Sequence, residues 1–319
     1  MSPRERVIAI VALSAAAAVA ATVGITYLQT RGESTSRPGA VGKPRAGAPP
    51  LELDFGERTD AEARALAQAE TLYNEHRRAE AGRIFARYDS LEAQVGSALA
   101  AWPAHGLDTL KRLVASHPHS ALAELHLGLA YYWSGRNADA VAAFRRTEAL
   151  QPDTPYALSA ASILHPEMPR LPLPLFVPSS PQPAAPTMEA LRTLARGRDV
   201  VARIYYGLAL QRLGRPVSAE RAFASAAAIA PNDPEALAAA AVGRFTKDHP
   251  ERAFSRLGPL AKRFPHSAVV RFHLGYLLTW IGQRRLAAKE LRLAVADAPG
   301  SIYARYAGTL LTALDHGTK

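Results

Sequence analysis

Histidine is the residue of this sequence best suited to metal binding or to general acid–base chemistry. The chain has ten histidines and no cysteine, which excludes disulfides, thiolate metal sites and cysteine nucleophiles. His117, His119 and His126 lie close together, but no His-Glu-x-x-His pattern or acidic cluster accompanies them. His266 repeats the loop position of one of them. We therefore interpret these histidines as structural and predict no metal and no cofactor.

Signatures of catalysis are missing from the sequence. It has no Gly-x-Ser-x-Gly, no phosphate-binding glycine-rich loop before Lys-Ser/Thr and no dinucleotide fingerprint. Acidic residues are scattered instead of paired. We predict that the protein is not an enzyme. The alternative, an unrecognised active site, would require polar groups that converge in a pocket.

The elements that carry these residues are helices, and they repeat. The sequence HPHSALAELHLGLAYYWSGR, which begins at His117, resembles FPHSAVVRFHLGYLLTWIGQ, which begins at Phe264, 147 residues later. Alanine runs favour helix, and no alternating strand pattern is present. Because 48% of the residues are hydrophobic and 21% charged, the composition is that of a folded protein. We predict an all-α fold.

Four units share one register: a small residue in a first helix, alanine twelve residues later, a bulky apolar residue sixteen later and proline twenty-four later. Small residues permit two antiparallel helices to cross closely, and we expect the bulky residue to fill the space to the next unit. Proline ends the second helix. The four sets are Gly128, Ala140, Phe144 and Pro152; Gly207, Ala219, Phe223 and Pro231; Ala241, Ala253, Leu257 and Pro265; and Gly275, Ala287, Leu291 and Pro299.

Caps and turns fit the same register. Ser120, Asp233 and Ser267 precede helical stretches as N-caps. Gly135 and its equivalents Gly214 and Gly282 mark the turn between paired helices. Weaker units precede residue 121, and a unit over 155–199 is interrupted by a proline-rich insert at about 165–186. We favour packing of this apolar insert against the helices over a role as a polyproline ligand.

This pattern resembles the tetratricopeptide repeat (TPR) family. The resemblance implies a TPR-like helical solenoid of antiparallel helix pairs over 58–319, whose first helices line a concave groove that binds a protein or peptide. It places groove residues two before and five after the helix glycine, and aromatic residues lie nearby. Lysine-type positions that clamp a carboxylate in chaperone-binding members hold Leu122, Val201, Glu235 and Val269, which argues against that use. The predicted partner-binding residues are His126, Tyr132, Trp133, Tyr205, Arg212, His273, Tyr276 and Trp280. For Trp133 and Trp280, packing between units is an equal alternative.

The N-terminus reads as a membrane segment. After a basic tail at 1–6, residues 7–28 are free of charge and, as a helix, would span roughly 33 Å. We predict a single transmembrane helix in a bacterial cytoplasmic membrane with the solenoid outside, although basic residues on both sides do not fix the orientation. The alternative is secretion after cleavage of a signal peptide. Residues 29–57 are rich in Gly and Pro and are predicted to be a flexible linker.

Charge supplies a second hypothesis. Net charge is +10, and residues 198–319 hold eighteen Lys and Arg against nine Asp and Glu. The first hypothesis is a membrane-tethered scaffold. Its aromatic groove would bind an apolar or amphipathic segment of a partner protein. The alternative is an adaptor for an anionic polymer or a membrane surface through the basic C-terminal repeats. We do not expect nucleic acid as the partner.

Overall fold

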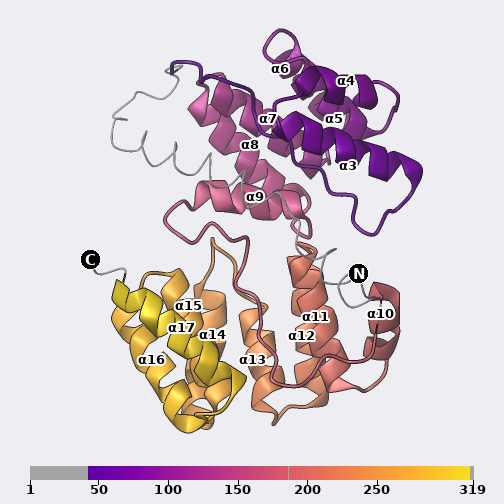
Figure 1. The fold of residues 1–319 in the computed structure, drawn as a ribbon. Helices are drawn as coiled ribbons and strands as arrows, with labels where there is room; N and C mark the ends of the chain where they lie inside the picture. The colour runs from indigo at the N-terminus through magenta and orange to yellow at the C-terminus, as the bar shows by residue number, and fades with distance from the viewer. Residues whose placement is uncertain (1–41, 186, 317–319) are drawn as a thin grey trace. The chain divides into compact units, whose positions relative to one another are not determined.

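The computed structural model describes residues 42–185 and 187–316. These residues form fifteen α-helices and, within the same ranges, no strand. The chain divides into two compact units (Figure 1), an N-terminal unit that ends at Pro166 and a C-terminal unit that begins at Glu167. The predicted single solenoid over 58–319 is therefore two helical arrays. The predicted basic tail and transmembrane helix lie outside the described residues.

The N-terminal unit consists of three helix pairs and a single further helix. Each helix packs on the next one in the sequence, as in a solenoid. The helices are α3 (Ala61–Asn74), α4 (Arg78–Phe85), α5 (Leu91–Ala100), α6 (Gly106–Ser116), α7 (Ala121–Trp133), α8 (Asn137–Leu150) and α9 (Pro155–Leu164).

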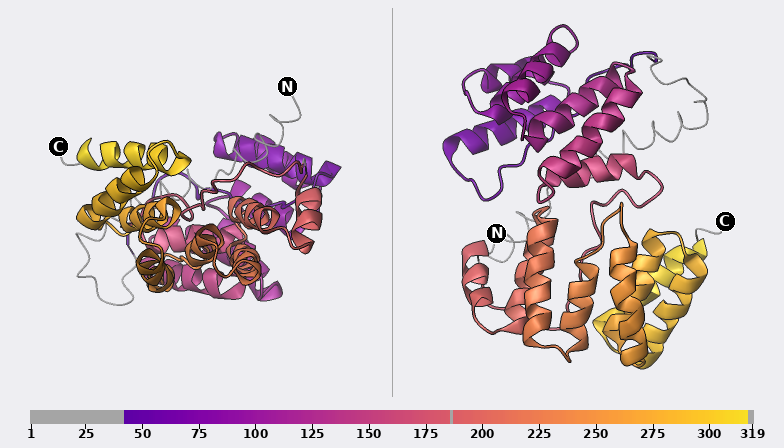
Figure 2. Two further views of the ribbon diagram at one scale, coloured as in Figure 1. Left: turned by 90° about the horizontal axis from the view of Figure 1, so that it is seen from below. Right: turned by 180° about the vertical axis from the view of Figure 1, so that it is seen from behind.

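The C-terminal unit begins with a single helix, continues with three pairs and ends with one more helix (Figure 2). The last helix packs on both helices of the pair before it, as a capping helix does. The helices are α10 (Met188–Arg196), α11 (Val200–Arg212), α12 (Pro216–Ile229), α13 (Pro234–Val242), α14 (Glu251–Arg263), α15 (Ala268–Trp280), α16 (Arg284–Asp297) and α17 (Ile302–His316).

The helix glycines set the distance between the two helices of a pair. A Cβ atom on Gly128 would lie 2.7 Å from the ring of Phe144, and one on Gly207 would lie 2.5 Å from the ring of Phe223. These approaches leave no room for a side chain. The Phe223 ring also lies 2.7 Å from where a Cβ atom on Gly243, at the end of α13, would be, so this ring reaches the next unit as expected.

Turn and cap chemistry follows the sequence. Gly135, Gly214 and Gly282 have φ of +76°, +68° and +72°, a region that favours glycine, and each lies between the helices of a pair. The Ser120 hydroxyl accepts a hydrogen bond from the Ala123 N–H at 3.2 Å. Ser267 precedes α15 in extended conformation but forms no side-chain cap.

The proline-rich insert separates two helices expected to form one pair. α9 packs on α7 and α8, whereas α10 packs on α11 in the other unit. Residues 165–185 contain no helix, and Leu173 and Phe176 in this segment are buried. The prediction that the insert packs against the helices is confirmed.

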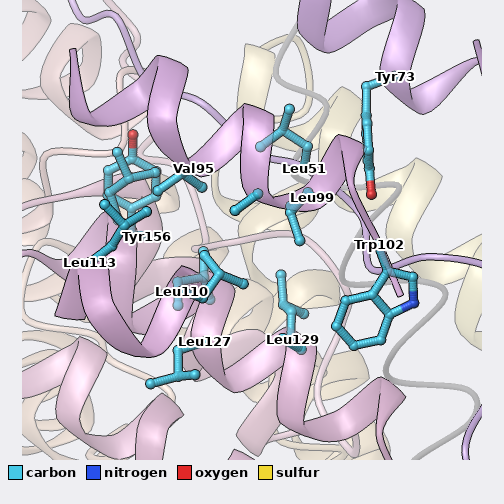
Figure 3. Packing of buried hydrophobic residues seen from close by; sticks show 14 of the residues in the cluster. Leu51, Tyr73, Val95, Leu99, Trp102, Leu110, Leu113, Leu127, Leu129 and Tyr156 are labelled. Carbon is cyan, nitrogen blue, oxygen red and sulfur yellow. The ribbon is translucent and has the colours of Figure 1, made fainter. Parts of the chain in front are cut away.

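Part of the predicted flexible linker is packed instead. Residues 42–57 are non-helical, but Pro49, Leu51 and Glu52 are buried against the helices of the N-terminal unit. Figure 3 shows Leu51 within the hydrophobic cluster that includes Val95 and Leu99. The linker prediction was wrong here because glycine and proline content outweighed the apolar residues at 51, 53 and 55. Residues 29–41 lie outside the described range.

None of the helices in residues 42–185 and 187–316 has the length and apolar character needed to cross a bilayer.

Candidate peptide-binding grooves

An extended segment of the chain itself lies along the first helices of each unit. We call residues 42–54 the N strap and residues 169–180 the C strap. Neither strap contains a helix, and each is held through its backbone by side chains of its own unit.

Side chains at the end of α3 bind the middle of the N strap. The Tyr73 hydroxyl donates to the Pro49 carbonyl at 2.7 Å. The Asn74 amide binds both polar groups of one residue: its Oδ1 accepts the Leu51 N–H at 3.3 Å and its Nδ2 donates to the Leu51 carbonyl at 3.0 Å. An amide side chain that pairs with both groups replaces the hydrogen bonds that a neighbouring strand would supply.

His126 receives the next N–H of the strap. Its Nδ1 lies 2.8 Å from the Leu122 carbonyl, which can only accept, so Nδ1 carries the proton. Nε2 is thus an acceptor, and the Glu52 N–H donates to it at 3.1 Å. The ring is fully buried, and burial lowers its pKa to about 4. A neutral imidazole is therefore required for this hydrogen bond.

The side chain of Glu52 is also buried, and its carboxylate accepts the Ser159 hydroxyl at 2.7 Å. Burial raises the pKa of Glu52 to about 7. Nearby, Glu70 accepts the Leu53 N–H at 2.8 Å, and burial together with the Glu52 and Asp54 carboxyls raises its pKa to about 8. These two carboxyls belong to the binding of the strap, since both lie against its backbone or are part of it.

The two ends of the N strap are fixed by other helices. The Asp54 N–H donates to the Tyr156 hydroxyl of α9 at 2.8 Å. At the opposite end, the Arg45 N–H donates to the Trp133 carbonyl at 2.8 Å, and the Arg45 guanidinium lies over the Tyr132 ring at 3.5 Å from its centre. Tyr132 and Trp133 are buried. This strap therefore runs across α3, α7 and α9.

The C strap is held in the same manner by α11 and α15. The Gln211 Oε1 accepts the Phe176 N–H at 3.0 Å, and its Nε2 donates to the Pro174 carbonyl at 3.4 Å. The Val177 N–H donates to Nε2 of His273 at 3.1 Å. The His273 Nδ1 lies 2.8 Å from the Val269 carbonyl, which fixes the same tautomer as in His126.

The side chain of Phe176 anchors the C strap. It is buried, its ring stacks on His273 at 4.4 Å between centres, and it lies 5.8 Å from the Phe223 ring. Burial lowers the pKa of His273 to about 4. As in the other unit, the imidazole is neutral and acts as an acceptor.

Both ends of the C strap are bound as well. The Ser179 N–H and hydroxyl donate to the Glu235 carboxylate, the former at 2.7 Å. The Tyr205 hydroxyl donates to the Ser180 carbonyl at 2.6 Å. At the start of the strap, the buried Lys247 ammonium donates to the Pro169 carbonyl at 2.8 Å, and burial lowers its pKa to about 8.

A cavity of about 670 Å³ flanks the C strap. Its walls are the strap itself and α11, α15 and α17, and Arg212, Tyr276 and Tyr306 contribute to them. Leu171 and Tyr306 at this cavity are 55% and 48% exposed. The groove of the C-terminal unit therefore holds its own segment and still has room beside it.

The predicted site residues fall into three groups. His126, His273 and Tyr205 bind strap backbone through their side chains. Arg212 and Tyr276 line the cavity. Tyr132, Trp133 and Trp280 are buried, and Trp280 packs edge-on against Phe245 at 5.7 Å. That these eight residues bind a partner remains a prediction.

Sequence reasoning missed the amide residues Asn74 and Gln211. Both lie in the last turn of a first helix, where a polar residue looks like ordinary surface. A signal was present in the strap: Leu51, Leu53 and Phe55 alternate with acidic residues, which is typical of an extended segment with one buried face.

His117 and His119 are exposed in the turn between α6 and α7, whereas His126 is buried. Within the part of the chain that the structure describes, no group of three or more His, Asp or Glu residues is arranged to hold a metal ion.

Comparisons with known proteins bear on the fold. Residues 122–154 match the tetratricopeptide repeat family. No curated protein matches the chain. Three similar solved structures are the APC/C hetero-tetramer Cut9-Hcn1 (18% identity, 80% of this chain and 49% of that chain, TM-score 0.34), the human IFIT1 dimer with m7Gppp-AAAA (16%, 82% and 64%, 0.35) and the TPR2AB domain of yeast Sti1 in complex with pHSP90 (12%, 80% and 98%, 0.31).

The chain spans about half the length of the first of these proteins and 64% of the second. At such TM-scores, none of these similarities carries an inference about partners. The family match covers α7 and α8, and the helix pairs α11–α12 and α15–α16 repeat its small-residue crossing. Residues 122–154 are thus similar to one tetratricopeptide repeat, and the described residues around them form further helix pairs.

Proposed function

We propose that the protein is a scaffold for protein–protein interaction that binds an extended segment of a partner in a concave groove. The proposal rests on how each groove binds an extended backbone. Side chains of the first helices satisfy successive N–H and C=O groups of a segment that has no strand to pair with. This mode of binding is general for peptides in grooves, because backbone hydrogen bonds give affinity and side-chain pockets give specificity.

No chemical step is part of the proposal. The amide and imidazole groups that face the straps are engaged with strap backbone, and the buried imidazoles are held neutral as acceptors. A general base would need to face a substrate atom within hydrogen-bond distance. We therefore propose a binding protein and not an enzyme.

Membrane tethering is proposed from residues 7–28 alone, whose uncharged length suits a bilayer. A C-terminal tag and external protease on intact cells stripped of outer layers test it. Digestion of the tag on a full-length, membrane-bound protein supports the proposed outside orientation. A protected tag would reverse the orientation, and a shortened soluble form would replace the anchor by a signal peptide.

Groove binding is tested by site-specific photocrosslinking in cells. We expect a photoreactive residue in place of Tyr306, at the cavity, to capture a defined partner. The matched control replaces Arg145, which is exposed on the second helix of its pair. Capture from both positions equally, or from Arg145 alone, would contradict groove binding.

A second candidate function has its own observation. Arg192, Arg196, Arg203 and Arg221 line one recess of about 500 Å³ in the C-terminal unit, and Arg192 pairs with Glu189 at 2.5 Å. Such a cluster suits an anionic polymer or membrane surface. Binding through it would weaken steeply between low and moderate salt, whereas binding in an apolar groove would change little.

A further inference from the structure

The two straps are bound by the same sequence of chemical groups although they share almost no sequence. In each, an amide side chain accepts the N–H of a buried apolar residue: Asn74 for Leu51 and Gln211 for Phe176. In each, a neutral histidine accepts the N–H of the following residue, at 3.1 Å in both units. Each groove therefore recognises two consecutive residues of an extended segment. The first is a buried apolar residue, the anchor, and the second is a residue whose backbone N–H can donate to the histidine.

The next strap position differs between the units. The Leu53 N–H is bound by Glu70 in the N-terminal unit. At the corresponding place the C strap has Pro178, which has no N–H. One residue further, the strap N–H is bound again in both units, by Tyr156 for Asp54 and by Glu235 for Ser179. The C-terminal groove thus accepts proline two residues after the anchor, and the N-terminal groove does not.

The surroundings of the two anchors also differ. Leu51 belongs to the continuous hydrophobic cluster of its unit, and the adjacent Glu52 is buried with its carboxylate on Ser159. Beside Phe176 lies the cavity of about 670 Å³, and Leu171 of the C strap is 55% exposed. Undocking the N strap would open a core. Undocking the C strap would expose the buried contacts of Phe176 with Phe223 and His273, and it would enlarge a cavity that already lies beside the strap.

We infer that the C strap is an internal ligand, and that the groove it fills binds a partner segment of the same chemistry. This segment is extended and apolar, with a large apolar anchor in the place of Phe176, a non-proline residue next and a proline-compatible position after it. The inference rests on the proposed function, because it names the partner class of that groove. The C strap itself is the argument for this occupant, since it is the segment seated there.

Covalent attachment makes the C strap a strong competitor. A segment tethered at both ends has an effective concentration in the millimolar range for a short flexible connection. A free segment must therefore displace it, and weakening the strap should strengthen binding of the free segment. The replacement Phe176→Ala removes the anchor, and Leu173→Ala removes a second buried contact.

The test uses a fluorescent peptide with the sequence of residues 170–182 and the full chain. We expect the double variant Leu173→Ala/Phe176→Ala to bind the peptide at least about ten-fold more tightly than the unchanged protein, by fluorescence anisotropy. A peptide that carries Val177→Pro lacks the N–H for His273 and should lose most of the gain. Adding Gln211→Ala and His273→Phe to the double variant should abolish the gain in peptide affinity. The matched control is Leu51→Ala, which should bind the peptide no better than the unchanged protein.

A second measurement covers the case in which the double variant does not fold. In the unchanged protein, hydrogen exchange of the Phe176 and Val177 amides should be faster than that of amides inside α15, and excess peptide should accelerate it further. Exchange of these amides only with global unfolding would overturn the inference. So would a folded double variant that binds no peptide, or one that binds the normal and Val177→Pro peptides equally.

These failures leave the proposed function standing if crosslinking from Tyr306 still captures a partner. Unchanged protein that dimerises by exchanging straps would identify a second copy as the occupant and would also overturn the inference. Conversely, a strap peptide that binds as expected without any captured partner would count against the scaffold role and not against the binding site.

Discussion

The N-terminal and C-terminal units bind their straps with the same pair of groups, yet the two straps have different physical roles. Leu51 and Phe176 are both buried in the core of their unit, and Phe176 and Val177 also line a cavity of about 670 Å³. Backbone recognition by an amide and a neutral histidine is thus common to both grooves. The surroundings of the anchor decide whether the strap is a permanent part of the fold or a removable ligand.

The largest expected difference comes from removing the anchors. Leu51→Ala should lower the free energy of unfolding of the N-terminal unit by about 2–5 kcal/mol, because it leaves a cavity in a continuous core. For Phe176→Ala, the loss is limited to the free energy of docking the C strap, so the helices should be less affected. Hydrogen exchange followed by mass spectrometry measures both. A Phe176→Ala protein in which α11 and α15 exchange as freely as the strap would contradict the difference.

Acidification from pH 7 to 5 should cost the C-terminal unit about 2 kcal/mol and should not destabilise the N-terminal unit. His273 has a folded pKa of about 4, below the usual 6.5, so the unfolded chain binds more protons in this window and the C-terminal unit loses stability. In the N-terminal unit, His126 also lowers stability as the pH falls. Glu52 and Glu70 have folded pKa values of about 7 and 8, above the usual 4.5, so they bind protons in the native state and offset the loss from His126. Urea denaturation at several pH values, read by exchange in each unit, is the measurement. Equal loss in both units would show that the two carboxyls are not buried as described.

Removing one acceptor should have a similar or smaller effect. His273→Phe keeps a ring against Phe176 but leaves the Val177 N–H without its acceptor, at a cost of about 1–3 kcal/mol. His126→Phe does the same to the Glu52 N–H. Faster exchange of these two amides is the expected signature. The pH dependence of the C-terminal unit should disappear in His273→Phe, and its persistence would assign that dependence to another group.

The amide residues should contribute less, about 1 kcal/mol each. Asn74→Ala and Gln211→Ala remove hydrogen bonds at positions where water can enter, since Asn74 is exposed and the cavity reaches Gln211. Local exchange at Leu51 and Phe176 should rise while the thermal midpoint changes little. No change in exchange at Leu51 or Phe176 would mean that the Asn74 and Gln211 side chains contribute nothing to holding the straps.

The smallest effect is expected at Lys247. Lys247→Met removes the hydrogen bond to Pro169 but also the cost of burying a charge, so the net change should stay below about 1 kcal/mol. Because its folded pKa is about 8 and the usual value is 10.5, the C-terminal unit should gain stability as pH rises from 8 to 10.5. That gain should vanish in Lys247→Met, and its survival would place the titration elsewhere.

The helix pairs were predictable because their packing is local and periodic. A glycine sixteen residues before a phenylalanine encodes one close crossing, and Gly128 with Phe144 and Gly207 with Phe223 show it. His126 and His273 were also predicted, from their place on the first helix. The straps were not, because hydrogen bonds such as Glu52 to His126 join residues 74 positions apart and leave no periodic trace. The glycine and proline content of residues 29–57 suggested a linker. The alternation of Leu51, Leu53 and Phe55 with acidic residues instead indicated a packed extended segment.

The central claim is that neutral His126 and His273 hold the straps through Nε2. Long-range ¹H–¹⁵N correlation spectra of the full chain test it directly by reporting the tautomer and titration of each imidazole. We predict that both rings carry the proton on Nδ1 at pH 7 and stay neutral down to about pH 5. Rings protonated on Nε2, or titration near the usual pKa of about 6.5, would show that the straps are not bound in this way.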